Sequence, residues 1–232
     1  MGRRPIGQKA MTPTQRQRRW REGKKPNSTR SKQRRRAERE RELAERTIAA
    51  SLALGRRQFG VIAADPPWRH EPYSRETGLD RAADNHYPTM TVDELMALQP
   101  PAAKDCVLYL WFPRAHLANA VKLAEAWGFT VKTLGGWDKE AVGTGYWLRD
   151  NFETYLIATK GHPPAPAPGT QPLALIRAPR GRHSEKPEKF YEDIERIFPN
   201  VPKLEMFARR PRPAWEGWGN EVITETAVVT RS

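Results

Sequence analysis

The stretch "VIAADPPWRH" (61–70) places a carboxylate, two prolines and a tryptophan directly after an apolar run. Proline lacks an N–H and has a fixed φ, so Pro66 and Pro67 make the turn rigid and leave the carbonyls of Asp65 and Pro66 as acceptors without a competing donor. The Asp65 carboxylate and the Pro66 carbonyl could therefore hold both protons of an amine on a planar base, with Trp68 as a stacking face. The alternative is that the prolines end a strand and that Trp68 packs in the core.

Alternating apolar and amphipathic segments must position this corner. The predicted strands are 59–64, 107–112, 130–137, 153–160, 173–178 and 203–208, and the predicted helices are 91–98, 115–127 and 187–197. Most of the strands are nearly continuous apolar runs, which is typical of a sheet buried on both faces. We therefore predict an α/β fold with a mixed sheet covered by helices on both faces. Ligands of such sheets bind beyond the carboxyl ends of the strands, where Asp65 should lie.

Two loops and four tryptophans are further features for which the sequence predicts a role. The polar segment 69–86 follows the corner and is long for a loop, so we predict a lid. The proline-rich segment 161–172 is expected to be a surface connection. We expect core packing for four tryptophans: Trp127, Trp137, Trp147 and Trp215.

The excess positive charge lies in the first quarter of the chain. Residues 1–58 contain 19 Lys and Arg against 5 Glu, a net charge of +14, whereas the whole chain of 232 residues carries +13. We predict a basic, partly disordered arm over 1–58 with a helix near 32–54, followed by a folded domain over 59–223 and a tail over 224–232. An arginine-rich arm attracts polyanions, which indicates nucleic acid; the alternative is a solubilising extension.

The remaining composition limits the class of protein. Cys106, the single cysteine, lies in an apolar run and is expected to be a core residue, as is typical of a reducing compartment. The sequence contains no signal-peptide pattern and no apolar stretch of membrane-spanning length. We expect a soluble cytoplasmic protein without membrane contacts and without a bound metal.

Seven sequence blocks resemble one known family over roughly residues 59–221. The blocks, in the family's order, are "ADPPW" (64–68), "HYPTMTVDEL" (86–95), "LYLWF" (108–112), "GTGYWLRDNFETYLIATKG" (143–161), "HSEKPEKFYEDIER" (183–196), "KLEMFAR" (203–209) and "WEGWGNE" (215–221). They resemble the adenine N6-methyltransferases that include the catalytic subunit of the eukaryotic messenger-RNA adenine methyltransferase and its bacterial and phage relatives. The resemblance implies a Rossmann-like methyltransferase fold with permuted motif order.

The resemblance also implies S-adenosylmethionine as methyl donor and the N6 amine of adenine as acceptor. By this resemblance, Asp65, Pro66, Pro67 and Trp68 form the catalytic corner, while Trp68 and Tyr87 border the base. We also place the next two residues, Arg69 and His70, on the substrate side. The residues expected at the cofactor are Asp65 near the methionine amine, Lys186 at its carboxylate, Glu205 and Arg209 at the ribose, and Asn220 with Glu221 at the ribose and adenine.

Four residues at three sites depart from relatives in this family. Glu221 replaces a glutamine found in many relatives, Arg210-Pro211 replaces a His-Asn pair of the eukaryotic enzyme, and Glu185 replaces a histidine. None of these lies at the Asp65 corner. We therefore predict an active enzyme of bacterial or phage type that methylates DNA after flipping the target base out of the duplex. The alternatives are an RNA adenine methyltransferase and a non-catalytic scaffold that binds nucleic acid. The sequence leaves open whether the protein forms a homo-oligomer.

Overall fold

The computed structural model places a single mixed sheet between two layers of helices. It describes residues 12–15, 34–35, 37–39, 41–42, 45, 47, 57–69, 89–145, 147–181 and 185–219. The described residues between 34 and 47 all have helical backbone, within the helix predicted near 32–54. Most of the basic arm, most of the predicted lid and the C-terminal tail lie outside the described part of the chain, so their predicted roles stay predictions.

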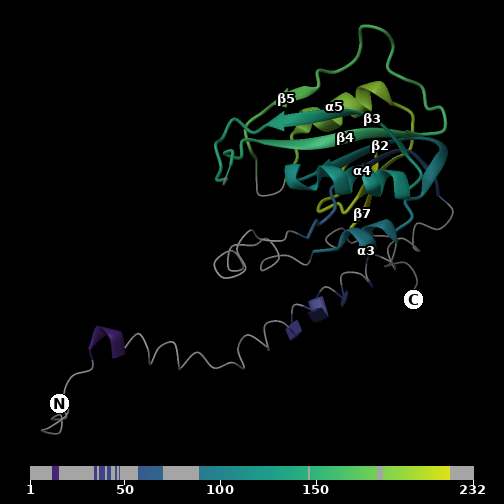
Figure 1. The fold of residues 1–232 in the computed structure, drawn as a ribbon. Helices are drawn as coiled ribbons and strands as arrows, with labels where there is room; N and C mark the ends of the chain where they lie inside the picture. Colours follow the sequence, from purple (N-terminus) through teal and green to yellow (C-terminus); the bar gives the residue numbers. More distant parts are fainter. Residues whose placement is uncertain are drawn as a thin grey trace, which may run out of the picture.

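Seven strands form the sheet of the described residues, in the order β5-β3-β4-β2-β1-β6-β7 (Figure 1). Their bounds are β1 Phe59–Ala64, β2 Ala102–Phe112, β3 Thr130–Asp138, β4 Phe152–Lys160, β5 Leu175–Arg177, β6 Lys203–Met206 and β7 Trp215–Trp218. The strand β4 runs antiparallel to β2 and β3, and the other neighbouring strands are parallel. The predicted mixed sheet of an α/β fold is confirmed.

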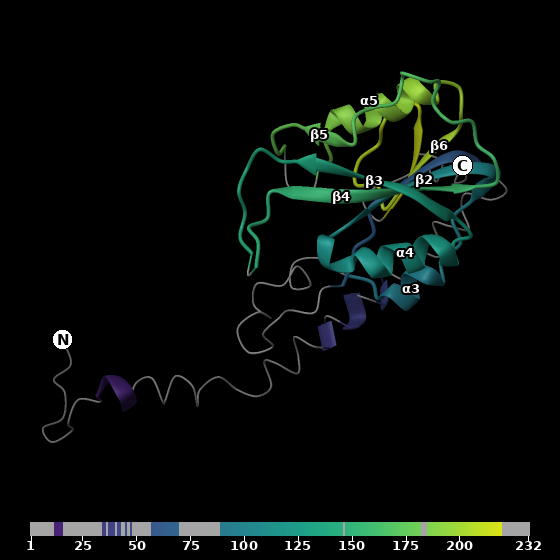
Figure 2. The same ribbon diagram turned by 45° about the horizontal axis from the view of Figure 1, so that its top comes forward.

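The central strand β1 is buried on both faces, as its apolar sequence predicts. Ile62 and Ala64 face one core cluster, while Val61 and Ala63 face the other. The helices α3 (Val92–Met96) and α4 (Leu117–Ala126) cover the first face, and α5 (Glu188–Ile197) covers the second (Figure 2). The carboxyl end of β1 thus opens between β2 and β6, with α5 above it.

Local sequence explains where the helices begin. Thr91 caps α3, because its hydroxyl accepts from the backbone N–H of Glu94 while the Glu94 carboxylate accepts from the backbone N–H of Thr91. The predicted helix 115–127 starts one residue earlier, as a 3-10 turn over Arg114–His116 that leads into α4. The predicted helix 187–197 begins one residue later, because Pro187 is the N-cap of α5.

Three predicted strands have clearly different bounds in the structure, and one observed strand was not predicted. The strand β2 begins at Ala102, before the predicted residue 107, and β6 ends at Met206, before the predicted residue 208. The predicted strand 173–178 is shortened to Leu175–Arg177, between Pro172 and Pro179, which cannot donate to a ladder. The short edge strand β7 was not predicted.

Of the four tryptophans with predicted core packing, three are buried and one is exposed. Trp127, Trp137 and Trp215 are buried, as predicted, and their indole N–H groups donate to Leu95 O, Ala178 O and the Glu195 carboxylate. Trp147 is 88% exposed, so its predicted core packing is wrong. Cys106 is buried, and burial raises the pKa of its thiol to about 12. Among the described residues, no helix is both long and apolar enough to cross a membrane.

Candidate active site

Asp65 lies directly after β1, and its carboxylate contacts a buried lysine from another part of the chain. The Asp65 Oδ2 atom is 2.8 Å from Lys186 Nζ, and the same Nζ is 2.9 Å from Glu153 Oε2. Glu153 belongs to the start of β4, and Lys186 comes just before α5. Three segments that are distant in sequence therefore bring two carboxylates and one ammonium together at the strand ends.

The ammonium of Lys186 remains charged in this position. Burial by itself would lower the pKa of Lys186, but the adjacent carboxylates of Asp65 and Glu153 outweigh that effect and raise the pKa above its ordinary value. The ammonium also lies 4.9 Å from the centroid of the Trp111 ring, where the electron-rich face attracts a cation. This cluster therefore presents a fixed positive charge beside two carboxylates.

The Asp-Pro-Pro-Trp corner is held by hydrogen bonds to the segment before α3. The Met90 N–H donates to Pro67 O at 2.8 Å, and the Arg69 N–H donates to Met90 O at 3.0 Å. The Trp68 N–H donates to Pro66 O at 2.8 Å, so the prediction of a Pro66 carbonyl without a competing donor is wrong. Since a carbonyl oxygen has two lone pairs, Pro66 O can still accept a second proton.

Trp68 anchors the corner in the core. Its side chain is buried, its Nε1 donates to Trp111 O at 3.0 Å, and its ring centroid lies 5.3 Å from that of His116. The predicted stacking face is therefore covered, and the core-packing alternative is the correct one. The reason is the polar tip of the indole, which finds a carbonyl partner inside the body.

A cavity of about 410 Å³ opens beside the Asp65 cluster. Its lining comes from the end of β1, from the beginning of α5, from the end of β6 and from residues 209–213. Four predicted site residues line it together: Asp65, Lys186, Glu205 and Arg209. Phe207, also in the lining, has a φ of 63°, a left-handed conformation that is uncommon outside glycine and concentrates at functional sites.

Glu205 lies on β6 next to the cavity and is bonded to helix α5. The Tyr191 hydroxyl donates to Glu205 Oε1 at 2.7 Å. Burial raises the pKa of the Glu205 carboxyl above its ordinary value, with the Asp65 charge acting in the same direction and the Tyr191 hydrogen bond opposing it. A half-buried carboxylate at a strand end is suited to accept hydrogen bonds from a pair of hydroxyl groups.

Sequence reasoning missed several residues of the site. Glu153 completes the cluster around Lys186, and Tyr191 fixes Glu205. Arg212 lies 4.1 Å over the Tyr191 ring and pairs with Glu188 and Glu195, two residues of α5. The helical spacing of Glu188, Tyr191 and Glu195, at i, i+3 and i+7, could have indicated that they share one face of α5.

The ion pairs continue from the cluster towards the loop between β3 and β4. Lys139 Nζ is 3.7 Å from Glu153 Oε1 and 2.8 Å from Asp150 Oδ2, and Asp150 Oδ1 is 3.0 Å from Arg114 Nη2. Elsewhere at the cavity, Arg210 Nη1 is 3.2 Å from Glu185 Oε1. These last two residues are departures from relatives of the family, and the structure shows that they contact each other.

The structure describes only some of the remaining predicted site residues. Arg69 is half-buried and donates through Nη2 to Thr89 O at 3.2 Å, so its guanidinium binds the segment before α3. Four predicted residues lie outside the described part of the chain: His70, Tyr87, Asn220 and Glu221. Within the part that is described, no group of three or more His, Cys, Asp and Glu residues could hold a metal ion.

Comparisons with known proteins identify the class. The family model described as MT-A70 matches residues 59–221. The chain is 34% identical over 187 residues to the "Type II methyltransferase M.MunI" of Mycoplasma sp, covering 73% of this chain and 80% of that protein. It is 28% identical over 176 residues to the "N(6)-adenosine-methyltransferase catalytic subunit METTL3" of Homo sapiens, covering 71% of this chain and 28% of that protein.

The relatives and the fold together define a methyltransferase. A further similarity, 30% over 175 residues, links the chain to the "N(6)-adenosine-methyltransferase MT-A70-like" of Arabidopsis thaliana, of which it covers 24%. The protein is thus an enzyme that methylates the N6 amine of adenine, and the chain belongs to the MT-A70 family. It spans about a quarter of the length of these eukaryotic relatives.

Proposed function

We propose that this chain transfers a methyl group from S-adenosylmethionine to the N6 amine of adenine in DNA, with Asp65 holding the amine. The observation that carries the proposal is the cluster of Asp65, Lys186 and Glu153 at the end of β1, beside the cavity. Similarity over 80% of the bacterial type II methyltransferase supports a self-contained enzyme, which favours DNA. RNA is the second candidate substrate, because several relatives are named as adenosine methyltransferases.

The corner orients the amine by accepting its protons. A carboxylate offers about four acceptor positions, so Asp65 can accept an amine proton while it remains paired with Lys186. The second proton is accepted by the remaining lone pair of Pro66 O. With both protons held, the nitrogen lone pair points away from the corner, and Asp65 orients rather than deprotonates the amine. Orientation of bound reactants can remove about 7–11 kcal/mol of a barrier.

The residues around the cavity fit the methyl donor. S-adenosylmethionine, when bound, supplies an electrophilic methyl group on a sulfonium. Lys186 would pair with its carboxylate and Glu205 would accept from the ribose hydroxyls; both line the cavity, as does Arg209. Trp111, one of the residues that line the cavity, carries a buried Nε1 donor without a hydrogen-bond partner among the described residues. Contacts of Asn220 and Glu221 with the cofactor, and of His70 and Tyr87 with the base, are part of the same proposal.

Surfaces outside the cavity would hold the nucleic acid. The arm over 1–58 carries a net charge of +14 and supplies salt-sensitive, sequence-independent affinity through phosphate contacts. The single buried cysteine and a nucleic-acid substrate favour a cytoplasmic location.

The test is transfer of labelled methyl to matched double-stranded DNA, single-stranded DNA and RNA, followed by mapping of the modified base. The parent, Asp65→Asn and the exposed control Asp93→Asn are compared, with calorimetry of S-adenosylmethionine binding for each. We expect N6-methyladenine in DNA from the parent and the control, and a loss of about 100- to 1000-fold in Asp65→Asn.

Three results would contradict parts of the proposal. Full activity in Asp65→Asn would remove Asp65 from the mechanism. Methylation of RNA alone would replace DNA as the substrate. A parent that binds nucleic acid but no S-adenosylmethionine would be a scaffold.

A further inference from the structure

The loop between β3 and β4, residues 139–151, carries exposed apolar side chains. Trp147 is 88% exposed, Leu148 is 72% exposed and Val142 is 63% exposed. A tryptophan in water leaves a large apolar and aromatic surface without the burial that normally stabilises it. Clusters of this kind on an otherwise polar surface typically mark a place where another molecule binds.

Hydrogen bonds close the base of this loop. The Lys139 N–H donates to Asn151 O at 2.9 Å, and the Asp150 N–H donates to Thr144 O at 3.1 Å. A side chain at Gly145 would bring its Cβ into collision with Leu148 O, so this position requires glycine. The loop therefore presents Trp147 from a braced turn, which lowers the entropy lost when a ligand binds.

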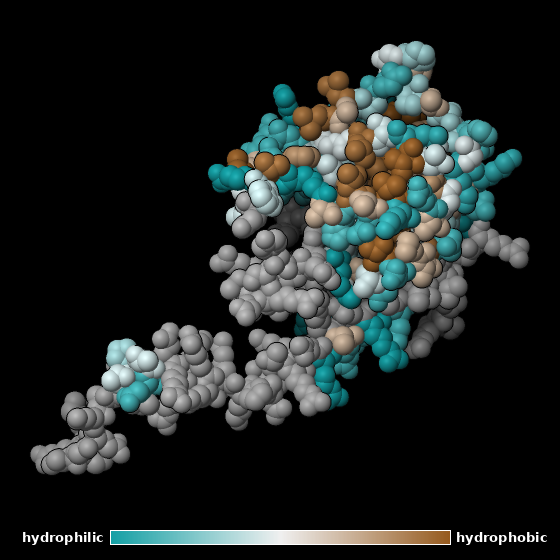
Figure 3. Space-filling model, in the orientation of Figure 1, coloured by the Kyte–Doolittle hydropathy of each residue, from teal (hydrophilic) through white to brown (hydrophobic). Residues whose placement is uncertain are grey.

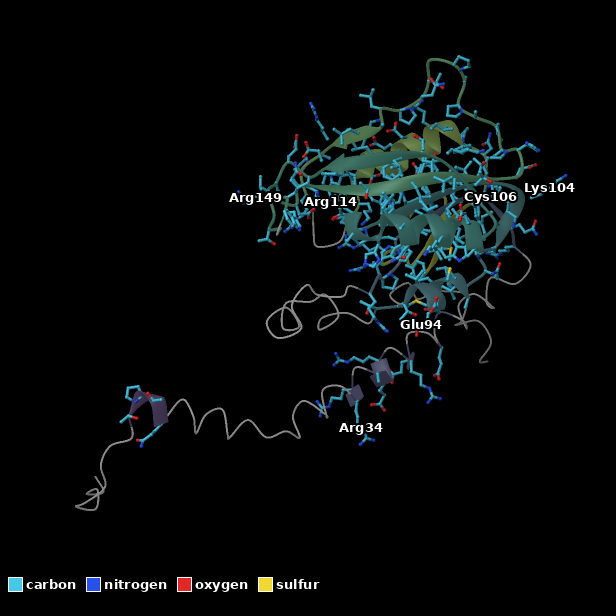
Figure 4. The ribbon with its side chains drawn as sticks, viewed as in Figure 1. Arg34, Glu94, Lys104, Cys106, Arg114 and Arg149 are labelled. Atoms are coloured by element: carbon cyan, nitrogen blue, oxygen red, sulfur yellow. The ribbon has the colours of Figure 1, made fainter. Side chains whose placement is uncertain are left out.

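The loop lies at the strand ends where Asp65 is found. It follows the carboxyl end of β3 and extends past the strand ends (Figure 2). Arg149 of this loop and Arg114, which follows β2, lie at one end of the sheet, whereas Lys104 and Cys106 lie at the other (Figure 4). Glu153 connects the loop to the site, because its carboxylate contacts both Lys186 and Lys139.

Exposed arginines at this edge match the charge of a phosphate backbone. Arg177 pairs in register with Asp138 at the end of β3, and Arg180 follows three residues later. Both are exposed, as is Arg149 on the loop itself. The space-filling view shows hydrophobic atoms among hydrophilic ones at the end of the molecule where these strand-end loops lie (Figure 3). Exposed aromatic and cationic side chains at the same end of a sheet are the groups with which proteins bind unpaired nucleotides.

We propose that Trp147 stacks on a nucleotide next to the adenine being methylated, while Arg149, Arg177 and Arg180 contact the neighbouring phosphates. The inference rests on the proposed function, because the loop would bind the same nucleic-acid strand whose adenine reaches the Asp65 corner. A nucleotide beside an extruded adenine loses one stacking partner, and the indole ring of Trp147 replaces it. The occupant is therefore a nucleic-acid strand and not a second copy of this chain.

The test is the affinity of the full-length protein for an end-labelled single-stranded DNA of about 12 nucleotides that contains one adenine. The variants are Trp147→Ala, Trp147→Phe and, as a matched control, Leu173→Ala, whose side chain is 83% exposed before β5. We expect Trp147→Ala to raise the Kd about 5- to 150-fold, Trp147→Phe to recover most of the affinity, and Leu173→Ala to change nothing. Replacing Arg177 with Gln should reduce the salt slope by about 0.7.

The readouts separate this inference from the proposed function. The Kd for S-adenosylmethionine should be equal in all of these variants, because Trp147 does not line the cavity. If the parent transfers methyl but Trp147→Ala binds the oligonucleotide as tightly as the parent, the inference is wrong and the proposed function stands. If the affinities change as expected while no variant and no parent transfers methyl, the proposed function fails and the strand contact stands. Dissociation of a parent dimer by Trp147→Ala in sedimentation would assign the surface to a second copy.

Discussion

Replacing Lys186 with methionine tests the charge cluster at the catalytic corner. The side chain is 9% exposed, and its Nζ lies 2.8 Å from Asp65 Oδ2 and 2.9 Å from Glu153 Oε2. At an effective dielectric constant of about 20, each attraction amounts to about 6 kcal/mol. The cost of burying an ammonium, several kcal/mol, offsets a large part of this attraction. Methionine has a similar length, so the variant removes the charge and leaves the packing largely unchanged.

The loss of stability in Lys186→Met should be smaller than the loss that follows when one partner of a fully buried ion pair is removed. Removing one partner of such a pair costs about 3–5 kcal/mol. The side chains of Asp65 and Glu153 are 33% and 36% exposed, so water screens part of the repulsion between them. We expect the free energy of unfolding at neutral pH to fall by about 1–3 kcal/mol in Lys186→Met.

The dependence on pH gives the sharper criterion. In the parent, the pKa of Lys186 is raised above its ordinary value of 10.5, so its contribution is complete below that value and is lost only as the pH rises through the folded-state pKa. In Lys186→Met that contribution is absent at every pH. The stability difference between parent and variant should therefore be complete at neutral pH and shrink as the pH rises above the ordinary lysine pKa of 10.5.

Urea denaturation across this pH range measures the difference, with Lys189→Met as the matched control. Lys189 pairs with Asp193 at 2.7 Å on the surface of α5, and its side chain is 55% exposed. Its loss should cost no more than about 0.5 kcal/mol. The reasoning is refuted if Lys186→Met is as stable as the control at neutral pH, or if its deficit does not change with pH. An unchanged Kd for S-adenosylmethionine would also exclude Lys186 as the partner of the methionine carboxylate.

Three further perturbations probe the surroundings of the site. Burial raises the pKa of the Glu205 carboxyl, so affinity for S-adenosylmethionine should fall as the pH drops through that raised pKa, and calorimetry on Glu205→Gln should show a weaker but pH-independent affinity. Replacing Trp68 with Phe leaves Trp111 O without its indole donor and should lower the free energy of unfolding by about 1–3 kcal/mol, measured as a lower urea midpoint. An unchanged midpoint would mean that this hydrogen bond does not hold the corner. Thr91→Ala removes the cap of α3 and should cost about 1 kcal/mol in the same assay, whereas Thr91→Ser should retain it.

The sequence by itself determined the sheet and the place of the catalytic corner. Continuous apolar runs such as "FGVIAA" predicted β1 with the observed bounds, because burial on both faces leaves no polar position in the pattern. The polar break at Asp65 located the strand end, and four predicted residues meet at one cavity. The strand β7 was not predicted, because a four-residue segment with two tryptophans is equally typical of a loop packed against the core.

Tertiary structure alone decided which charges and surfaces come together. Glu153 is an ordinary carboxylate in the sequence, and only the antiparallel pairing of β4 with its neighbours β3 and β2 places it beside Lys186. Trp68 and Trp147 are alike as residues, yet the first donates to a carbonyl in the core and the second lies in water at a loop tip. The physical reason is that hydrophobic patterning records whether a segment is buried, while the partner of a polar or aromatic group depends on contacts between segments that are distant in the chain.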